Sequence, residues 1–321
     1  MRRLLVVAVL AVVFTVHAGW VVLSQAGRPP GALRNEKVKG DLYMISGEGG
    51  NVAAYVTGEG VILVDDMFDR NHADILAQLK QLTSQPLKYV FNTHQHDDHA
   101  GGDAKMLPIA EVIAHRNVRL NLIAKRQPFF EDTPGTPIGL PRVTFADEAS
   151  VFLGGKEVRA LHFGRGHTNG DAVIYFPELG VVHTGDLFLA TRAAAGRRGS
   201  AAQPPQNRPP GVPAFIDYSQ GGSFKEWSTT LERTLALDFD TVIPGHGPVS
   251  AKADIVKFKA DLEAMRTRLS GLIKQGRSRE EIVRTLESDY GWRSTGCPPS
   301  PPTPGCLQYQ QVDALIAELK Q

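Results

Sequence analysis

Three histidines and two aspartates lie within six consecutive residues of this chain, in the stretch N-T-H-Q-H-D-D-H-A-G-G that contains His94 to His99. Imidazole nitrogens and carboxylate oxygens are the groups that proteins offer to zinc, iron and manganese. A solvated polar turn is the alternative interpretation. One short segment rarely completes a metal site, so a metal here needs further ligands from distant parts of the chain.

Three further candidate ligands follow predicted strands. His167 lies in G-R-G-H-T-N-G-D, Asp186 in H-T-G-D, and His246 in I-P-G-H-G. The ends of strands are where α/β folds build their sites. Glycines flank nearly all of these residues, and glycine lets the backbone turn tightly and approach a small centre.

The candidate ligands are five histidines and two aspartates: His94, His96, Asp98, His99, His167, Asp186 and His246. This is more than one tetrahedral zinc ion needs, so the set predicts two metal ions. Nitrogen and oxygen donors together favour zinc, with iron or manganese as alternatives.

The four motifs resemble, in order, those of the metallo-β-lactamase-fold hydrolases, and the resemblance runs from about Asp41 to Ala264. It implies an α/β fold, a four-layer αβ/βα sandwich, with a dinuclear site along one edge. By position, one metal would be bound by His94, His96 and His167, and the other by Asp98, His99 and His246. Asp186 would bridge the two metals. Asp65 matches an acidic residue that supports the histidine loop from outside the ligand set.

The resemblance also implies a reaction. Two divalent metals lower the pKa of a shared water, and the resulting hydroxide attacks a carbonyl carbon. Asp98 would be the catalytic residue, because it can orient the hydroxide and pass its proton to the leaving group. The expected substrate is a small acyl compound: an ester, a lactone, a thioester or a β-lactam.

Asp186 distinguishes the chain from well-known β-lactamases, which have cysteine or serine at that position. With an aspartate at this position, the chain is more similar to glyoxalase II and lactonases. The stretch I-D-Y-S-Q-G-G-S-F-K-E-W, residues 216–227, is similar to one in exported members linked to quinoprotein pathways. Asp217, Tyr218 and Ser223 in this stretch are interpreted as a turn and a helix cap, with substrate contact as the alternative.

Two other functions remain as alternatives to hydrolysis. One is a mononuclear iron oxygenase, as in the sulfur dioxygenases of this fold, which keep a subset of the ligands. The other is a metal-binding accessory protein of a periplasmic redox system without turnover. Both complete ligand sets are present here, which favours hydrolysis. Nucleic acid is not expected as a partner, because 35 basic and 34 acidic residues leave a net charge of +1.

The first residues predict export. Met1-Arg2-Arg3 precedes an apolar run, and small residues near positions 18 and 26 offer cleavage sites, so residues 1–26 are interpreted as a signal peptide. An uncleaved membrane anchor through residues 4–23 is the alternative. Either way the folded part would be periplasmic or secreted. In that compartment Cys297 and Cys306 are expected to form a disulfide.

The remaining pattern alternates strands and helices, which predicts a layered α/β domain. We expect the hydrolase domain at 37–290 and a C-terminal extension with a short helix at 291–321. Strands are expected at 42–45, 52–56, 61–64, 89–91, 112–114, 158–163, 172–176, 181–183 and 241–243. Helices are expected at 72–82, 118–124, 224–237, 252–274, 280–288 and 309–319. Residues 27–35 are interpreted as a linker, and residues 191–213 as a long loop without periodicity.

Overall fold

The computed structural model describes residues 33–124, 139–190, 214–292 and 312–321. These residues belong to one compact unit, Gly31–Gln321. The predicted signal peptide, the 191–213 loop and the Cys297–Cys306 disulfide lie outside the described residues. Within the described ranges, no helix is both long enough and apolar enough to cross a membrane.

The first half of the unit forms a seven-stranded mixed sheet, in the order β1-β2-β3-β4-β5-β6-β7. Its strands β4 to β7 run parallel to one another, and the others pair antiparallel. The strands are β1 (Arg34–Lys39), β2 (Leu42–Ser46), β3 (Val52–Val56), β4 (Val61–Val64), β5 (Leu87–Asn92), β6 (Glu111–His115) and β7 (Val143–Phe145).

The second half forms a six-stranded sheet, in the order β13-β12-β11-β10-β9-β8. Only β11 and β12 pair in parallel within it. The strands are β8 (Glu148–Leu153), β9 (Lys156–Leu161), β10 (Val173–Phe176), β11 (Val181–His183), β12 (Thr241–Ile243) and β13 (Ser250–Ala251).

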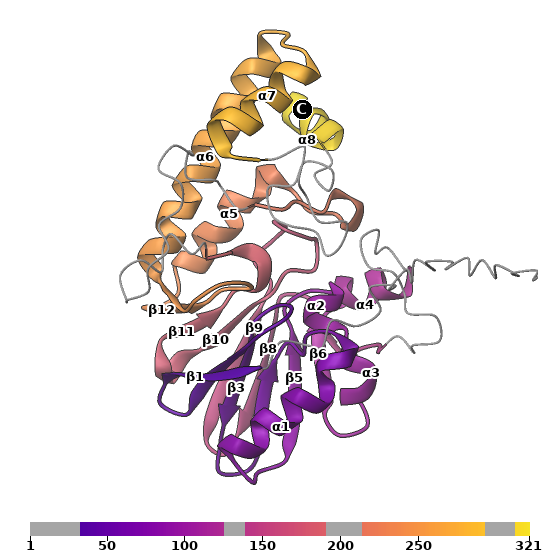
Figure 1. Cartoon of the computed structure of the whole chain (residues 1–321), viewed down its shortest axis with the longest axis vertical. Coiled ribbons are helices and arrows are strands. Elements are labelled where there is room, and N and C mark those ends of the chain that lie inside the picture. Colours follow the sequence, from indigo (N-terminus) through magenta and orange to yellow (C-terminus); the bar gives the residue numbers. More distant parts are fainter. Residues whose placement is uncertain (1–32, 125–138, 191–213, 293–311) are drawn as a thin grey trace, which may run out of the picture. The chain divides into compact units, whose positions relative to one another are not determined.

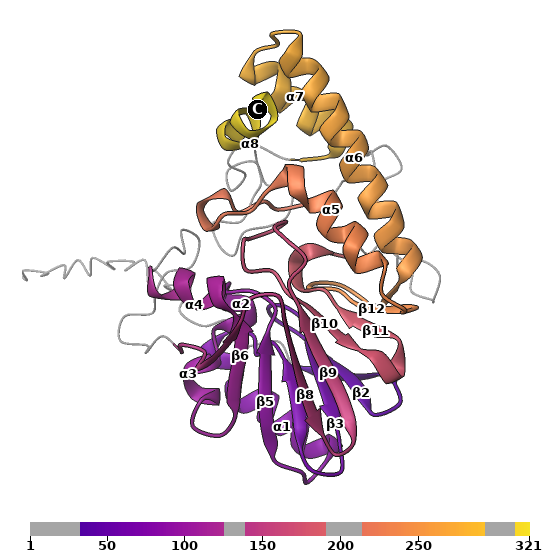
Figure 2. The same ribbon diagram turned by 180° about the vertical axis from the view of Figure 1, so that it is seen from behind.

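Helices cover the outer sides of both sheets (Figures 1 and 2). The α-helices are α1 (His72–Leu82), α2 (Asp97–Ala100), α3 (Asp103–Met106), α4 (Arg116–Ile123), α5 (Phe224–Leu235), α6 (Lys252–Lys274), α7 (Arg279–Tyr290) and α8 (Val312–Lys320). The short 3-10 helices are η1 (Asp69–Asn71), η2 (Pro177–Leu179), η3 (Gly185–Leu187) and η5 (Tyr218–Gln220).

The alternation of side chains along a strand explains the layers. In β4, Ile62 and Val64 pack into the cluster between the two sheets, whereas Val61 and Leu63 pack into the cluster beneath α1. Successive strand residues point to opposite faces, so a continuous apolar run fits a strand covered on both sides. A third cluster joins the outer face of the second sheet to α5, α6, α7 and α8.

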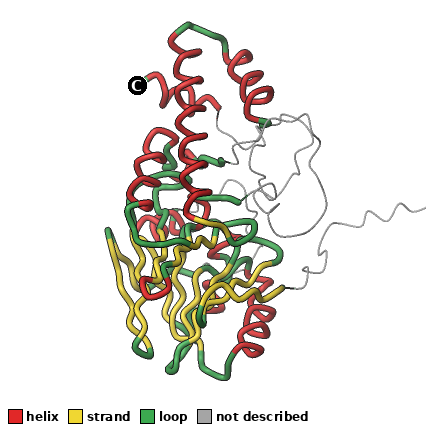
Figure 3. The backbone as a smooth tube through the Cα atoms, turned by 90° about the vertical axis from the view of Figure 1, so that its left-hand side faces the viewer, coloured by secondary structure: helices red, strands yellow, loops and turns green. Residues whose placement is uncertain are grey.

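These clusters give the order helix, sheet, sheet, helix, which is the four-layer αβ/βα sandwich that the sequence predicts. Figure 3 shows the strands of the two sheets packed side by side, with helices on the outer sides. α8 packs in the same cluster as α6, so the C-terminal helix is part of this compact unit.

Most predicted elements lie where the sequence places them, and α6 has the predicted bounds. The linker interpretation of residues 27–35 is wrong at its end, because β1 begins at Arg34. The predicted strand at 158–163 begins earlier and ends at Leu161. β7, β8 and β13 were not predicted. In the highly charged β1 no residue is fully buried, so no hydrophobic alternation marks it as a strand.

Candidate metal centre

Two pairs of parallel strands bring the candidate ligands to one edge of the sandwich. In the first sheet, Val64 of β4 pairs with Phe91 of β5, so Asp65 and the histidine stretch leave the sheet side by side. In the second, His183 of β11 pairs with Ile243 of β12, which places Asp186 beside His246 in the same way. Loops after parallel strands meet at one edge of the sheet.

Asp65 holds the histidine stretch in place. It follows β4 in the left-handed conformation, with φ 61°, which aspartate tolerates better than most residues. Its carboxylate accepts hydrogen bonds from the Thr93 backbone N–H at 2.7 Å and the Thr93 hydroxyl at 2.8 Å. It also accepts one from His99 Nδ1 at 2.8 Å. Asp65 therefore has the supporting position that the sequence predicts.

The G-H-T-N-G-D motif forms the loop between β9 and β10. Asp171, at its end, is buried and accepts hydrogen bonds from the backbone N–H and the hydroxyl of Thr168. Burial raises the pKa of Asp171 to about 7, against the opposing effect of these bonds. Ala172 N–H donates to Thr93 O at 2.8 Å, which ties this loop to the histidine stretch. The turn thus presents His167 toward His96.

The H-T-G-D and P-G-H-G motifs contact each other through their glycines. Gly245 N–H donates to Gly185 O at 2.9 Å. A Cβ atom on Gly245 would lie 2.0 Å from Asp186 Oδ1, so no other residue fits at this crossing without displacing the carboxylate. His183 is buried, donates to Asn51 O and accepts from Gly185 N–H, so its role here is structural.

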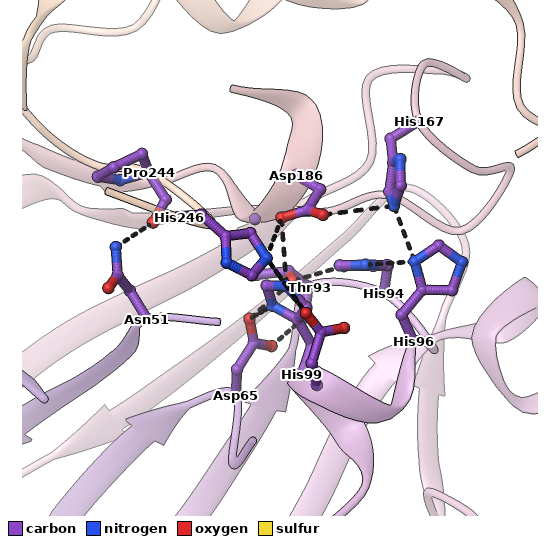
Figure 4. Close-up of polar contacts among 12 residues, drawn as sticks. Asn51, Asp65, Thr93, His94, His96, His99, His167, Asp186, Pro244 and His246 are labelled. Atoms are coloured by element: carbon purple, nitrogen blue, oxygen red, sulfur yellow. Dashed lines mark hydrogen bonds and ion pairs between the residues drawn. The ribbon is translucent and has the colours of Figure 1, made fainter. Parts of the chain in front are cut away.

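The first group of candidate ligands contains His94, His96, His167 and Asp186, all of them buried. His96 Nδ1 lies 3.2 Å from His94 Nε2 and 2.9 Å from His167 Nε2. Figure 4 shows the three rings directed toward one another, with Asp186 beside His167.

Each ring in this group has an inner nitrogen, which faces the other rings, and an outer nitrogen, which lies near a hydrogen-bond acceptor. His96 Nε2 lies 3.0 Å from Asp217 Oδ2, and His167 Nδ1 lies 2.7 Å from Phe215 O. His94 Nδ1 lies 3.0 Å from the Thr93 hydroxyl, whose own proton goes to Asp65. Each outer nitrogen thus carries the proton, which leaves the inner nitrogen of a neutral ring with a lone pair.

Three inward lone pairs at such distances repel one another unless a proton or a cation lies among them. This arrangement fits a metal ion, because histidine ligands characteristically donate their second ring N–H to an outer acceptor. The donor set, three imidazoles and a carboxylate, suits zinc and other first-row divalent ions.

The second group contains Asp98, His99 and His246. His246 Nε2 lies 3.2 Å from Asp98 Oδ2 and 3.3 Å from His99 Nε2. Because the Nδ1 proton of His99 goes to Asp65, its Nε2 is the ring nitrogen that faces the group and would bind a cation once the ring is neutral. This set of two imidazoles and a carboxylate also fits a divalent cation.

Asp186 lies between the two groups and presents one oxygen to each. Its Oδ2 lies 3.6 Å from His167 Nε2, and its Oδ1 lies 3.2 Å from His99 Nε2 and 3.5 Å from His246 Nε2. This is the geometry expected of a carboxylate shared by two cations. The structure therefore brings together all seven residues that the sequence proposes as ligands, in the predicted division.

The pKa shifts show how strongly the site depends on opposite charges. Burial lowers the pKa of His167 to about 4, and the neighbouring His96 adds to this shift. Burial alone would raise the pKa of Asp98, but His99 and His246 outweigh it and hold that pKa below its usual value. Likewise His246 and His99 hold the pKa of Asp186 well below its usual value despite burial. Both carboxylates are thus ionised and ready to bind cations at neutral pH.

The site opens toward solvent beside His246. The His246 side chain is 35% exposed, Asp98 and Asp186 are about 10% exposed, and the other rings are buried. A substrate must therefore approach from the side of the second group.

The sequence model of the metallo-β-lactamase superfamily matches residues 45–246, which include all seven candidate ligands. The chain belongs to this superfamily. Its members are mostly hydrolytic enzymes, which supports a hydrolase here.

Several curated superfamily members are similar to the chain. It is 26% identical over 243 residues to the 2,4-dinitroanisole O-demethylase subunit alpha of Nocardioides sp., a match that covers 74% of this chain and 65% of that protein. It is 26% identical to the metallo-beta-lactamase type 2 of Bacillus cereus, covering 67% and 75%. It is 33% identical over 119 residues to the hydroxyacylglutathione hydrolase of Synechococcus sp., covering 36% and 40%.

Solved structures show the same fold. The DIM-1 metallo-beta-lactamase superimposes with a TM-score of 0.56 at 18% identity, over 74% of this chain and 99% of that one. The metallo-beta-lactamase of Pontibacter korlensis gives a TM-score of 0.56 at 19% identity, over 72% and 99%. At this identity the likeness describes the fold alone.

Two residues of the centre were not predicted as supports. Asp217, interpreted as part of a turn, is fully buried and accepts from His96 Nε2, while Ser223 is the predicted helix cap of α5. Asn51 Nδ2 donates to Pro244 O at 2.9 Å and Gly247 O at 2.8 Å, and so holds the loop of His246. No local pattern marks either residue, because each acts on a partner more than 100 positions away in the sequence.

Proposed function

We propose that this protein is an exported dinuclear zinc hydrolase that cleaves a small acyl substrate. The observation that carries the proposal is Asp186, whose two oxygens face two separate groups of buried ligands. A protein with a single ion needs no shared carboxylate between complete donor sets. The basic start and apolar run of residues 1–26 support export.

When bound, a pair of zinc ions supplies a water nucleophile that is ionised near neutral pH and a positive centre for the developing oxyanion. Residues of the chain would position the metal ions that supply this nucleophile and this positive centre. The three histidines of the first group would hold one ion, the three residues of the second group would hold the other, and Asp186 could contribute an oxygen to each.

Asp98 is the proposed catalytic residue. Its carboxylate is ionised, slightly exposed, and lies on the open side of the site next to His246. A carboxylate there can accept a hydrogen bond from the nucleophile and pass a proton to the leaving group. His94, His96 and His167 are buried, so we assign them a role in binding alone.

The substrate class is drawn from the chain's relatives and its charge. The curated relatives include enzymes named for β-lactams and for hydroxyacylglutathione, both small acyl compounds. The near-neutral net charge supports a small molecule over a nucleic acid. The similarity to an O-demethylase subunit favours one second candidate, cleavage of an aryl methyl ether.

The test is to purify the mature chain, measure its metal content, and assay β-lactams, lactones, thioesters, simple esters and 2,4-dinitroanisole. We expect zinc and turnover of at least one acyl compound. Turnover of 2,4-dinitroanisole alone would replace acyl hydrolysis by the second candidate. Bound iron with oxygen uptake and no hydrolysis, or zinc without any turnover, would overturn the proposal.

His96→Ala and Asp98→Asn should each reduce the activity found by at least about 1,000-fold, since each removes a ligand or the proton carrier. Asp97→Asn is the matched control, because Asp97 neighbours Asp98 but belongs to neither group of ligands. It should retain activity. Undiminished turnover in His96→Ala or Asp98→Asn would show that the reaction takes place elsewhere.

A further inference from the structure

The C-terminal helix α8 packs against the part of the second half that supports the metal centre. Val312 and Leu315 are buried in the cluster that α5, α6 and α7 form with the second sheet. α8 lies beyond residues 45–246, the part that the superfamily's sequence model matches. Its role therefore does not follow from the match to the superfamily.

One side chain of α8 reaches the segment that follows residue 213. The Glu318 carboxylate accepts hydrogen bonds from Ser223 Oγ at 2.6 Å, from the Tyr218 hydroxyl at 2.7 Å and from the Phe224 backbone N–H at 3.1 Å. Phe224 is the first residue of α5, whose unpaired N–H groups and dipole favour a carboxylate. Burial and Glu318 together raise the pKa of Tyr218, so its hydroxyl stays a donor.

The same segment holds two histidines of the first group. Phe215 O accepts from His167 Nδ1, and Asp217 Oδ2 accepts from His96 Nε2. The Asp217 N–H donates to His167 O at 2.9 Å. Residues 215–224, which we call the support segment, thus contact the metal centre on one side and Glu318 on the other.

The connection between the two sides is short. Asp217 is bonded directly to Tyr218, and its backbone oxygen accepts from Gly222 N–H at 2.8 Å, one residue before Ser223. A shift of Tyr218 or Ser223 therefore moves the Asp217 carboxylate relative to His96. Ring orientation matters to a metal site, because partners outside the ligand set commonly change metal affinity by about 10- to 100-fold.

We propose that Glu318 is a positioning residue for the first group of ligands. By binding Tyr218, Ser223 and Phe224 it fixes the support segment, and the segment in turn fixes the orientation of His96 and His167. The proposal rests on the proposed function only in that this group binds a cation. Beyond the proposed function, it states that the geometry of the metal centre depends on the C-terminal helix α8.

The test compares Glu318→Ala and Glu318→Gln with wild type in the full chain. In metal-free protein, nuclear magnetic resonance follows the exchange of the His96 Nε2 proton with water. In a second measurement, competition with a chelator gives the zinc affinity of the first group. Glu318→Ala should speed the exchange and weaken zinc binding by about 3- to 10-fold, somewhat less than loss of a direct partner. Glu318→Gln keeps one acceptor oxygen, so its exchange rate and zinc affinity should lie between those of wild type and Glu318→Ala.

Asp313→Asn is the matched control on the same helix. Asp313 pairs with Arg279 of α7 at 2.7 Å, and both side chains are at least half exposed. Such exposed pairs contribute about 1 kcal/mol or less, so this variant should match wild type in both measurements. If Glu318→Ala fails to fold, Tyr218→Phe removes one of the three donors to Glu318 and is compared in its place.

Unchanged exchange and affinity in the Glu318 variants would contradict the proposal. So would equal losses in Asp313→Asn, because α8 would then act through general stability. Absence of zinc binding in wild type would instead contradict the proposed function. The exchange rate in metal-free protein would still decide the role of Glu318.

Discussion

At the scale of single residues, the centre consists of rings whose two nitrogens face different partners. The outer nitrogen of His99 donates to Asp65, as that of His96 donates to Asp217. These outer carboxylates select the tautomer that leaves the inner nitrogen free to bind. They also hold the rings before any cation arrives, which lowers the entropy lost on binding.

Asp65→Asn tests this support at its most connected residue. One amide group would face donors of Thr93 or His99, so at least one of the three hydrogen bonds is lost. We expect the zinc affinity of the second group to fall by about 10- to 100-fold, measured by chelator competition. Asp69→Asn is the control, since Asp69 pairs with Lys105 near the surface. Equal affinities in Asp65→Asn and wild type would refute the supporting role.

At the scale of elements, the centre depends on the close approach of η3 and the loop after β12. Gly245→Ala should place a methyl group against Asp186 Oδ1, which requires the carboxylate or the backbone to move. We expect a loss of about 1–3 kcal/mol in the free energy of unfolding, with weaker zinc binding at both groups.

Gly271→Ala is a matched control for that substitution. Gly271 lies in α6, and its Cβ would meet no atom within 4 Å. Alanine there should raise the free energy of unfolding by about 0.5–1 kcal/mol, because glycine is a poor helix former. Urea unfolding of both variants measures the contrast. A Gly245→Ala protein as stable as wild type, with unchanged zinc affinity, would show that the crossing tolerates a side chain.

A buried acid pair beneath the histidine stretch makes stability depend on pH. Burial raises the pKa of Asp103 in α3 to about 7, and burial and Asp103 raise the pKa of Asp66 well above its usual value. Asp66 accepts from Gly102 N–H, and Asp103 accepts from Asn92 Nδ2. The folded protein therefore keeps a proton on this pair at pH values where the unfolded chain has released it.

Because folding raises the pKa of Asp103, the protonated carboxyl stabilises the folded protein fully below about pH 4. This stabilisation is lost as the pH rises to about 7. At about 1.4 kcal/mol for each pH unit, Asp103 lowers the free energy of unfolding by at most about 4 kcal/mol over this range. Asp103→Asn should show a smaller decrease between pH 4 and 7 in urea unfolding of the metal-free protein. Identical pH profiles for the two proteins would contradict the raised pKa.

At the scale of the whole molecule, hydrophobic periodicity predicts most helices and strands, and the sequence motifs predict the candidate ligands. The apolar run Val61–Val64 and the helical spacing of Lys252–Lys274 mark β4 and α6, since packing on both sheet faces and on one helix face requires those patterns. The ligands stand out because their residue types cluster at strand ends. β1 was missed because its charged side chains leave no hydrophobic alternation, and β8 was missed although its buried Val151 and Leu153 alternate with exposed residues.

The supports of the centre could not be predicted in the same way. Asp217 lies 121 positions from His96, and Asn51 lies 193 positions from Pro244. Their roles arise only when the two halves of the sandwich pack together. Glu318 shows the same limit, because its three partners lie 94 to 100 positions earlier. Supports of this kind are properties of the folded molecule.

The proposed function requires one chain to bind two divalent ions in two groups of ligands that share Asp186. The most direct measurement is calorimetric titration of the metal-free protein with zinc. We expect two equivalents for each wild-type chain, and one tight equivalent in His167→Ala and in His246→Ala, because each variant disrupts a different group. A wild-type chain that binds one equivalent or none would contradict a dinuclear centre.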